Sequence, residues 1–393
     1  MKLFTAAACA LVLWILQGVV FHRFWSRGLS VSLAFDCHDK VEGERGRLKE
    51  IITNAKSLPL PILHVKFQMG RELVFTSAGN YKITDNNYRS DIFSCMPWQE
   101  IRRSLEFDCR KRGYYRISKV QLVSYDLFFS GHFVSVLPAC ACLYVYPKEV
   151  DLDRLSLPFC SLMGQIPAKR ALLLDPFEIQ SVRPYQSYDP YRSVNWKATA
   201  RTGDLKVNVY TPTASWQVMF LLDVDSDRVW KDEALTEEAV RLCGSYCRLL
   251  IREGIPVSVC TNGTDCLTGQ KGFVEAGAGG DHITAVMELL ARIRTDDGPR
   301  LSMEQVMEEL ASARPPGFGG SDFLTYILIS PRQHSSLALA YEELCQSAPD
   351  SQWILPVRPK NAISSGEERF SPDEFLRFTV FFWEVAYDYS QVS

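Results

Sequence analysis

The sequence predicts a multidomain protein with an N-terminal transmembrane helix, an all-β immunoglobulin-like sandwich and a doubly wound α/β domain. Three observations lead to this fold class. Residues 3–21 hold no charged side chain, residues 30–147 repeat apolar side chains with period two, and residues 214–360 alternate apolar runs with helical patterns. The predicted boundaries are 1–28 for the membrane anchor, 29–147 for the sandwich, 148–213 for a linker with a charged and aromatic segment, 214–360 for the α/β domain and 361–393 for a helical C-terminal tail.

Composition excludes some classes of partner and site. The chain of 393 residues is too long for one ordinary core. A net charge of -3 gives no electrostatic reason to expect nucleic acid, whose binding proteins usually carry a basic excess. The twelve cysteines are scattered, which favours buried thiols in a reducing compartment, and the six dispersed histidines disfavour zinc.

The N-terminal apolar run is the basis of the predicted membrane anchor. Its nineteen residues would span about 28 Å as a helix, close to the roughly 30 Å hydrocarbon core of a bilayer. A cleaved signal peptide is the alternative, but no small-residue cleavage site follows the run. Arg23 and Arg27 after the run favour a cytoplasmic body slightly over an extracytoplasmic one. We therefore expect a single-pass protein of the cell membrane that contacts lipid through this helix.

The next region alternates apolar and polar side chains. Leu63, Val65 and Phe67 alternate with His64 and Lys66, as in strands buried on one face only. Turn signals separate such segments at intervals typical of a β-sandwich.

From residue 214 the pattern changes to buried strands and helices. Residues 216–222 form a nearly continuous apolar run of strand length, which indicates a strand covered on both faces. Apolar residues at helical spacing follow from Leu235 to Leu249, and the alternation continues to a strand at 353–357. Such an alternation predicts right-handed crossovers and a doubly wound parallel sheet.

The aspartates after the first of these strands are the candidate metal ligands. Asp223, Asp225 and Asp227 fall at the carboxyl end of a parallel strand, where ligands of doubly wound sheets bind. We expect no cofactor, and the one candidate is Mg²⁺, because carboxylates suit a hard cation. The alternative is that they form turns and cap a helix. No GxSxG or HExxH motif occurs, so we assign no catalytic residue and expect no enzyme activity.

Charged and aromatic side chains are densest between residues 175 and 201. We expect Asp189 to bind the arginines around it and Trp196 to offer its ring to a guanidinium, which would make a structural clasp. The residues of this signature, which we interpret as structural, are Glu178, Arg183, Tyr185, Asp189, Arg192, Asn195, Trp196, Lys197 and Arg201.

The spacing of this whole set resembles the signature of the bacterial "domain of unknown function 58" family. The resemblance implies a membrane-anchored protein with a von Willebrand factor A-like domain, whose partner is an AAA+ ATPase of the MoxR type. Two features depart from the family: one N-terminal hydrophobic helix in place of a hairpin, and Tyr188 where glycine is usual. The A-like metal motif, Asp-x-Ser-x-Ser, retains only Asp223, and the later strand offers Ser330.

The leading functional hypothesis is a non-enzymatic adaptor that binds a protein, a MoxR-type ATPase, in assembly or cell-envelope processes. Two alternatives stay open. One is a metal-dependent enzyme that uses the aspartate loop, and the other is an extracytoplasmic adhesion protein, which would need the opposite orientation.

Overall fold

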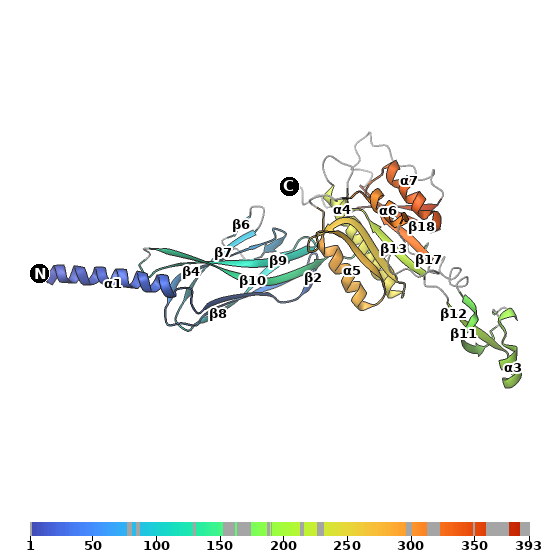
Figure 1. Cartoon of the computed structure of the whole chain (residues 1–393), viewed down its shortest axis with the longest axis horizontal. Helices are drawn as coiled ribbons and strands as arrows, with labels where there is room; N and C mark the ends of the chain where they lie inside the picture. The colour runs from blue at the N-terminus through green and yellow to red at the C-terminus, as the bar shows by residue number, and fades with distance from the viewer. Residues whose placement is uncertain are drawn as a thin grey trace. The chain divides into compact units, whose positions relative to one another are not determined.

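The computed structural model divides the chain into two compact units, Met1–Lys148 and Glu149–Ser393 (Figure 1). The structure describes residues 2–76, 81–83, 87–128, 131–151, 162, 174–186, 189, 191–212, 216–225, 232–295, 301–312, 323–348, 350–358 and 377–385. Each unit is described by itself below.

The first unit consists of one helix and two β-sheets. Its elements are α1 (Lys2–Phe24), β1 (Leu29–Phe35), β2 (Asp39–Val41), β3 (Arg45–Asn54), β4 (Leu60–Met69), β5 (Leu73–Phe75), β6 (Tyr81–Ile83), β7 (Asn87–Cys95), β8 (Glu100–Cys109), β9 (Gly113–Tyr125) and β10 (His132–Tyr146). One sheet has the order β1-β3-β8-β5 and the other β2-β10-β9-β4-β7-β6. All neighbours pair antiparallel except β2 and β10, which pair parallel.

Alternation along the strands builds the core of this unit. In β3 the inward positions Leu48 and Ile52 are fully buried, while Arg47 and Lys49 on either side of Leu48 are exposed. In β4 the same period buries Val65 and Phe67. The buried apolar side chains of both sheets belong to one cluster, so the period-two pattern in the sequence marks the strands correctly.

The prediction of a transmembrane helix, and with it the single-pass membrane localisation, is wrong. The helix itself forms as α1, but no helix in the described part of the chain is long and apolar enough to cross a membrane. Its last turns contribute to the protein core, where Phe21 is 1% exposed and its ring lies 5.7 Å from that of Phe133. Gln17 donates a hydrogen bond to Asp126. The turns before Gln17 extend only about 21 Å, short of the roughly 30 Å that a bilayer core requires.

The second unit holds a two-stranded sheet and a larger α/β sheet. Its elements are β11 (Leu174–Pro184), η1 (Tyr191–Ser193), α3 (Trp196–Thr202), β12 (Lys206–Pro212), β13 (Trp216–Leu222), α4 (Glu233–Arg252), β14 (Val257–Asp265), β15 (Lys271–Gly277), α5 (Gly280–Arg292), β16 (Ile293–Arg294), α6 (Met303–Ser312), β17 (Phe323–Ile329), α7 (Ser335–Leu344), η2 (Cys345–Ser347), β18 (Ser351–Val357) and β19 (Phe378–Glu384). β11 and β12 pair antiparallel, within the segment predicted to be a linker.

The larger sheet carries helices on both faces. Its order is β15-β14-β13-β17-β18-β19, with β16 beside β14, and the four pairs from β14 to β19 are parallel. Met219 and Leu221 of β13 pack in a cluster with side chains of α6 and α7. Phe220, on the opposite face, places its ring 5.5 Å from that of Tyr246 in α4. β13 is therefore covered on both faces, which explains its continuous apolar run.

The tail contains a strand where the sequence analysis predicted a helix. Residues 378–384 form β19, which extends the sheet by pairing parallel with β18. Phe378 and Trp383 are buried there. The segment is rich in aromatic and β-branched residues, which favour strands, and pairing with an open sheet edge outweighs any helical tendency.

Candidate functional site

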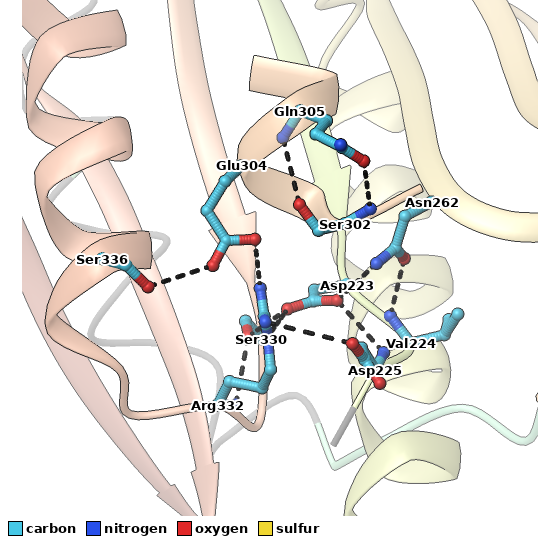
Figure 2. A network of polar contacts seen from close by, with 10 residues as sticks. All are labelled: Asp223, Val224, Asp225, Asn262, Ser302, Glu304, Gln305, Ser330, Arg332 and Ser336. Carbon is cyan, nitrogen blue, oxygen red and sulfur yellow. Dashed lines mark hydrogen bonds and ion pairs between the residues drawn. The ribbon is translucent and has the colours of Figure 1, made fainter. Parts of the chain in front are cut away.

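Three neighbouring parallel strands end at one edge of the α/β sheet and bring polar side chains together (Figure 2). Asp223 follows β13, Asn262 lies near the end of β14, and Ser330 and Arg332 follow β17. Since parallel strands run in the same direction, the residues that follow them meet at the carboxyl edge, where doubly wound folds bind ligands.

Asp223 is completely buried, and donors of the protein occupy both of its carboxylate oxygens. Oδ1 accepts from Asn262 Nδ2 at 2.7 Å and from the backbone N–H of Asp225 at 3.1 Å. Oδ2 accepts from Ser330 Oγ at 2.8 Å and from Arg332 Nε at 2.9 Å. These four donors satisfy the carboxylate, as a buried charge requires.

Arg332 links the carboxylates of this edge. Besides its bond to Asp223, its Nη2 donates to Glu304 Oε2 at 2.8 Å, and its Nη1 lies 3.9 Å from Asp225 Oδ2. The Arg332 side chain is 9% exposed. We call Asp223, Asp225, Asn262, Glu304, Ser330 and Arg332 the edge network. It holds three carboxylates around one guanidinium.

The start of α6 positions Glu304. Ser302 Oγ accepts from the backbone N–H of Gln305, and Gln305 Oε1 accepts from the backbone N–H of Ser302, an exchange that has the form of a capping box. Ser336 of α7 donates to the second oxygen of Glu304 at 3.3 Å. Glu304 therefore joins both helices of one face to the edge of the sheet.

The charges in the network are coupled. Burial raises the pKa of Asp223, and Arg332 opposes that shift. Burial also acts to lower the pKa of Arg332, but the surrounding carboxylates outweigh it and raise the pKa, so the guanidinium stays charged. For Glu304, burial acts to raise the pKa, but the hydrogen bond from Arg332 and weaker contacts outweigh it, so the net effect is a lowered pKa. The network is thus held together by an internal cation.

The described members of the predicted metal set do not fit Mg²⁺. Asp223 has no oxygen left for a cation, and the guanidinium of Arg332 lies among the carboxylates that would bind one. No group of three or more histidine, cysteine or acidic side chains in the described ranges is arranged to hold a metal ion. Asp227 lies outside those ranges. The Mg²⁺ hypothesis for Asp223, Asp225 and Asp227 stays a prediction.

The second candidate region is the segment with the sequence signature. We call β11, η1, α3 and β12 the signature unit. In it Arg183 makes a two-pronged pair with Asp189, with Nη1 to Oδ2 at 2.7 Å and Nη2 to Oδ1 at 2.6 Å. The backbone N–H of Gln186 also donates to Asp189. These bonds lower the pKa of Asp189 and close the loop after β11.

Asn195 fixes the start of α3. Its Oδ1 accepts from the backbone N–H of Ala198 at 2.9 Å, and its Nδ2 donates to Asn208 of β12 at 2.7 Å. Gly203 ends the helix with φ of 78°, a left-handed conformation that glycine adopts without strain. Asn195 is therefore a helix cap that also ties α3 to the hairpin.

The aromatic side chains of this unit are largely exposed. Trp196 is 65% exposed and Tyr191 is 70% exposed, although Tyr191 stacks on Tyr185 with ring centroids 5.7 Å apart. Lys197 and Arg201 are exposed as well. Among the side chains that the structure describes, no cation lies over the ring of Trp196. The side chains of Glu178 and Arg192 are not among those that the structure describes.

Sequence reasoning found some of these residues and missed others. It singled out Asp223, Ser330 and the pair Arg183 and Asp189, all of which the structure places in contacts. It missed Asn262, Glu304 and Arg332. Applying the carboxyl-edge rule to the ends of β14 and β17 would have found Asn262 and Arg332. Glu304 lies within a capping signal, Ser302-x-x-Gln305, which marks a helix start but does not indicate a contact to Arg332.

Comparison with known proteins gives one family match. Residues 181–323 match the model of the family described as "Protein of unknown function DUF58". The matched range begins inside the signature unit and ends at the start of β17, so it includes every residue that carried the resemblance except Glu178. The match confirms the resemblance to the DUF58 family, whereas the MoxR-type partner and the von Willebrand factor A-like domain stay predictions. Comparison with curated proteins finds no match.

Solved structures give weak likenesses. A non-cellulosomal cohesin from Archaeoglobus fulgidus matches with 12% identity and a TM-score of 0.23, over 32% of this chain and 95% of its own. A CARDB domain of Pyrococcus furiosus, solved with di-metal ions, matches with 9% identity and a TM-score of 0.19, over 30% and 94%. The sixth cohesin of scaffoldin B from Acetivibrio cellulolyticus matches with 10% identity and a TM-score of 0.23, over 30% and 99%. Scores of this size carry no argument about this chain.

Proposed function

We propose that this DUF58 family protein is a non-enzymatic interaction protein that binds a protein partner through its signature unit. The observation that carries the proposal is the exposure of Trp196 and Tyr191 on a unit in which Asp189 and Asn195 are held by hydrogen bonds. Large exposed aromatic side chains bury much apolar surface when a partner covers them.

The residue types at this surface are those that dominate binding energy in protein interfaces. Trp, Tyr and Arg are enriched among such hot spots, and here Trp196 and Tyr191 occur with exposed Arg201. Lys197 adds a second exposed cation. The surface therefore suits a partner that offers an apolar pocket with acidic groups around it.

The rigidity of the signature unit supports the same proposal. The bidentate pair of Arg183 with Asp189 and the cap by Asn195 hold the backbone on both sides of η1. A surface that is ordered before binding loses less conformational entropy when the partner arrives, which strengthens binding.

The edge network supports a role without catalysis. Asp223 is engaged by four donors, and Arg332 is held charged by carboxylates. Asp223 therefore offers no lone pair to a substrate, and a charged Arg332 cannot accept a proton, so neither group is arranged as a general base or nucleophile. In this proposal the network stabilises the α/β sheet and leaves recognition to the signature unit.

For the identity of the partner, the family resemblance implies an AAA+ ATPase of the MoxR type. The test uses the purified full chain and such an ATPase from the same genome, with affinity measured by biolayer interferometry. Trp196→Ala should weaken binding about thirtyfold. Trp98→Ala is the matched control, because Trp98 is 72% exposed but lies outside the signature unit. Equal affinity of wild type and Trp196→Ala would overturn the proposal.

A further inference from the structure

A basic hollow lies on the outer face of the six-stranded sheet, in the first unit. It has a volume of about 500 Å³, and its polar lining comes from β4 and β9: Lys66, Gln68, Arg116, Ser118, Lys119 and Gln121. Val136 of β10 adds an apolar side chain. Neither the edge network nor the signature unit includes any of these residues.

The hollow exists because two paired strands separate. β4 and β9 pair from Leu63 with Ser124 as far as Phe67 with Val120, and their pairing ends there. Both strands continue beyond that point, β4 to Met69 and β9 back to Gly113. Residues 68–70 of one segment and Arg116, Ser118 and Lys119 of the other line the hollow, beyond the point where β4 and β9 stop pairing with each other.

The ring of Tyr115 keeps the strands apart. It packs against Gly70 so closely that a Cβ on that glycine would lie 2.6 Å from the ring. Tyr115 is itself held in place, since its hydroxyl donates to the carbonyl of Lys111 at 2.8 Å. On the other side of β9, the register with β10 shifts between Pro138 and Ala141. The opening is thus built into the packing of the sheet.

The charges of the hollow are all of one sign. Among the residues that the structure describes, Lys66, Arg116 and Lys119 line it, and no acidic side chain does. In the described part of the chain none of these three cations makes an ion pair. This contrasts with the four-stranded sheet of the same unit, where exposed arginines are paired: Arg45 with Asp108, Arg47 with Glu106 and Arg102 with Glu100. A net charge of -3 for the chain makes a local excess of three cations more distinctive.

We propose that this hollow binds an acidic segment of a partner protein in extended conformation. The separated strands offer backbone donors and acceptors, which an added strand can pair with. The carboxylates of the bound segment would pair with Lys66, Arg116 and Lys119, while its small side chains would lie over Val136. Phosphates of nucleic acid or lipid would match the charges but leave the backbone acceptors unused.

The test measures binding of a short fluorescein-labelled peptide of alternating Glu and Thr to the full chain by fluorescence anisotropy. Binding should weaken at least tenfold in the double variant Lys66→Glu, Lys119→Glu. Lys49→Glu is the matched control, because Lys49 is an exposed lysine on the four-stranded sheet, and it should bind as the wild type does. Trp196→Ala should also leave peptide binding unchanged, which separates this proposal from that for the signature unit.

Two further peptides decide between charge and strand pairing. A peptide with Gln in place of Glu tests charge, and one that alternates Glu with Pro keeps the charge but lacks half of the backbone donors. Both should bind at least tenfold more weakly than the first peptide. Equal binding of either one would overturn the proposal. So would tighter binding of inorganic phosphate, phosphatidylglycerol vesicles or single-stranded DNA, measured by competition in the same assay.

Discussion

The edge network and the signature unit both centre on an arginine–aspartate pair, but the pairs differ in burial. Arg332 and Asp223 have side chains 9% and 0% exposed, and three further groups of the network satisfy the aspartate. Arg183 and Asp189 have side chains 37% and 6% exposed, and they leave Tyr191 and Trp196 uncovered nearby. The same kind of ion pair is therefore buried in the edge network but lies beside exposed aromatic side chains in the signature unit. In the first the pair stabilises the core of a sheet, and in the second it stabilises the surface that we propose to bind a partner.

The largest expected effect comes from removing the internal cation. Arg332→Met should lower the free energy of unfolding by about 3–5 kcal/mol, because Asp223 is left buried without its counter-charge. Thermal unfolding followed by circular dichroism measures the loss. The double variant Arg332→Met, Asp223→Asn should recover part of it, since the uncompensated charge is gone. A single variant as stable as the wild type would show that the network does not stabilise the sheet.

The next effect is on binding. Trp196→Ala should cost about 2 kcal/mol of affinity for the partner and change the free energy of unfolding by less than about 0.5 kcal/mol, since its ring is mostly in solvent. This reverses the expectation from the sequence, which gave Trp196 a role in stability. Chemical denaturation and biolayer interferometry on the same preparation measure both quantities. A large loss of stability with unchanged affinity would restore the clasp interpretation.

A smaller effect is expected at the pair in the signature unit. Arg183→Lys keeps the charge but cannot make the two parallel bonds to Asp189, so the loop that positions Tyr191 should become less ordered. Affinity for the partner should fall less than in Trp196→Ala, and the thermal midpoint should barely change. Amide hydrogen exchange at residues 183–189 measures the loosening. Unchanged exchange together with unchanged affinity would mean that the pair does not organise this surface.

The smallest effect concerns pH. The pKa of Glu304 in the folded protein is below its ordinary value of 4.5, so the stability that it contributes is present above that value and is lost as pH falls through the folded pKa. The contribution should be under about 1 kcal/mol, because Glu304 is partly exposed. Urea unfolding at pH 7 and near pH 4 measures it against Glu304→Gln, which lacks this ionisation. If the variant lost stability over this interval as steeply as the wild type, Glu304 would not be the group responsible.

Local patterns predicted much of the fold because they depend on few neighbours. The alternation in β4 and the apolar run of β13 directly reflect one covered face and two covered faces, respectively. The N-terminal segment is helical as predicted, but the sequence could not show whether this helix contacts lipid or packs on the protein. Whether Phe21 faces lipid or packs on Phe133 depends on a residue more than a hundred positions away. The same limit applies to β19, whose partner β18 supplies the sheet edge.

The position of the candidate site could be predicted from the sequence, but the full set of residues that form it could not. The carboxyl-edge rule pointed to Asp223, yet it could not show that Arg332, more than a hundred residues later, would contribute the cation. Similarly, the spacing of Arg183 and Asp189 indicated an ion pair, whereas the exposure of Trp196 depends on what the rest of the unit leaves uncovered.

The most direct test of the different roles of these two regions is site-specific photo-crosslinking. A benzophenone amino acid is placed at position 196 in one variant and at position 225 in another, in the full chain and in native cells. We expect a crosslinked protein partner, identified by mass spectrometry, from position 196 and none from the edge network at position 225. Crosslinking from 225 with none from 196 would contradict the account, since the edge network would then be the binding surface.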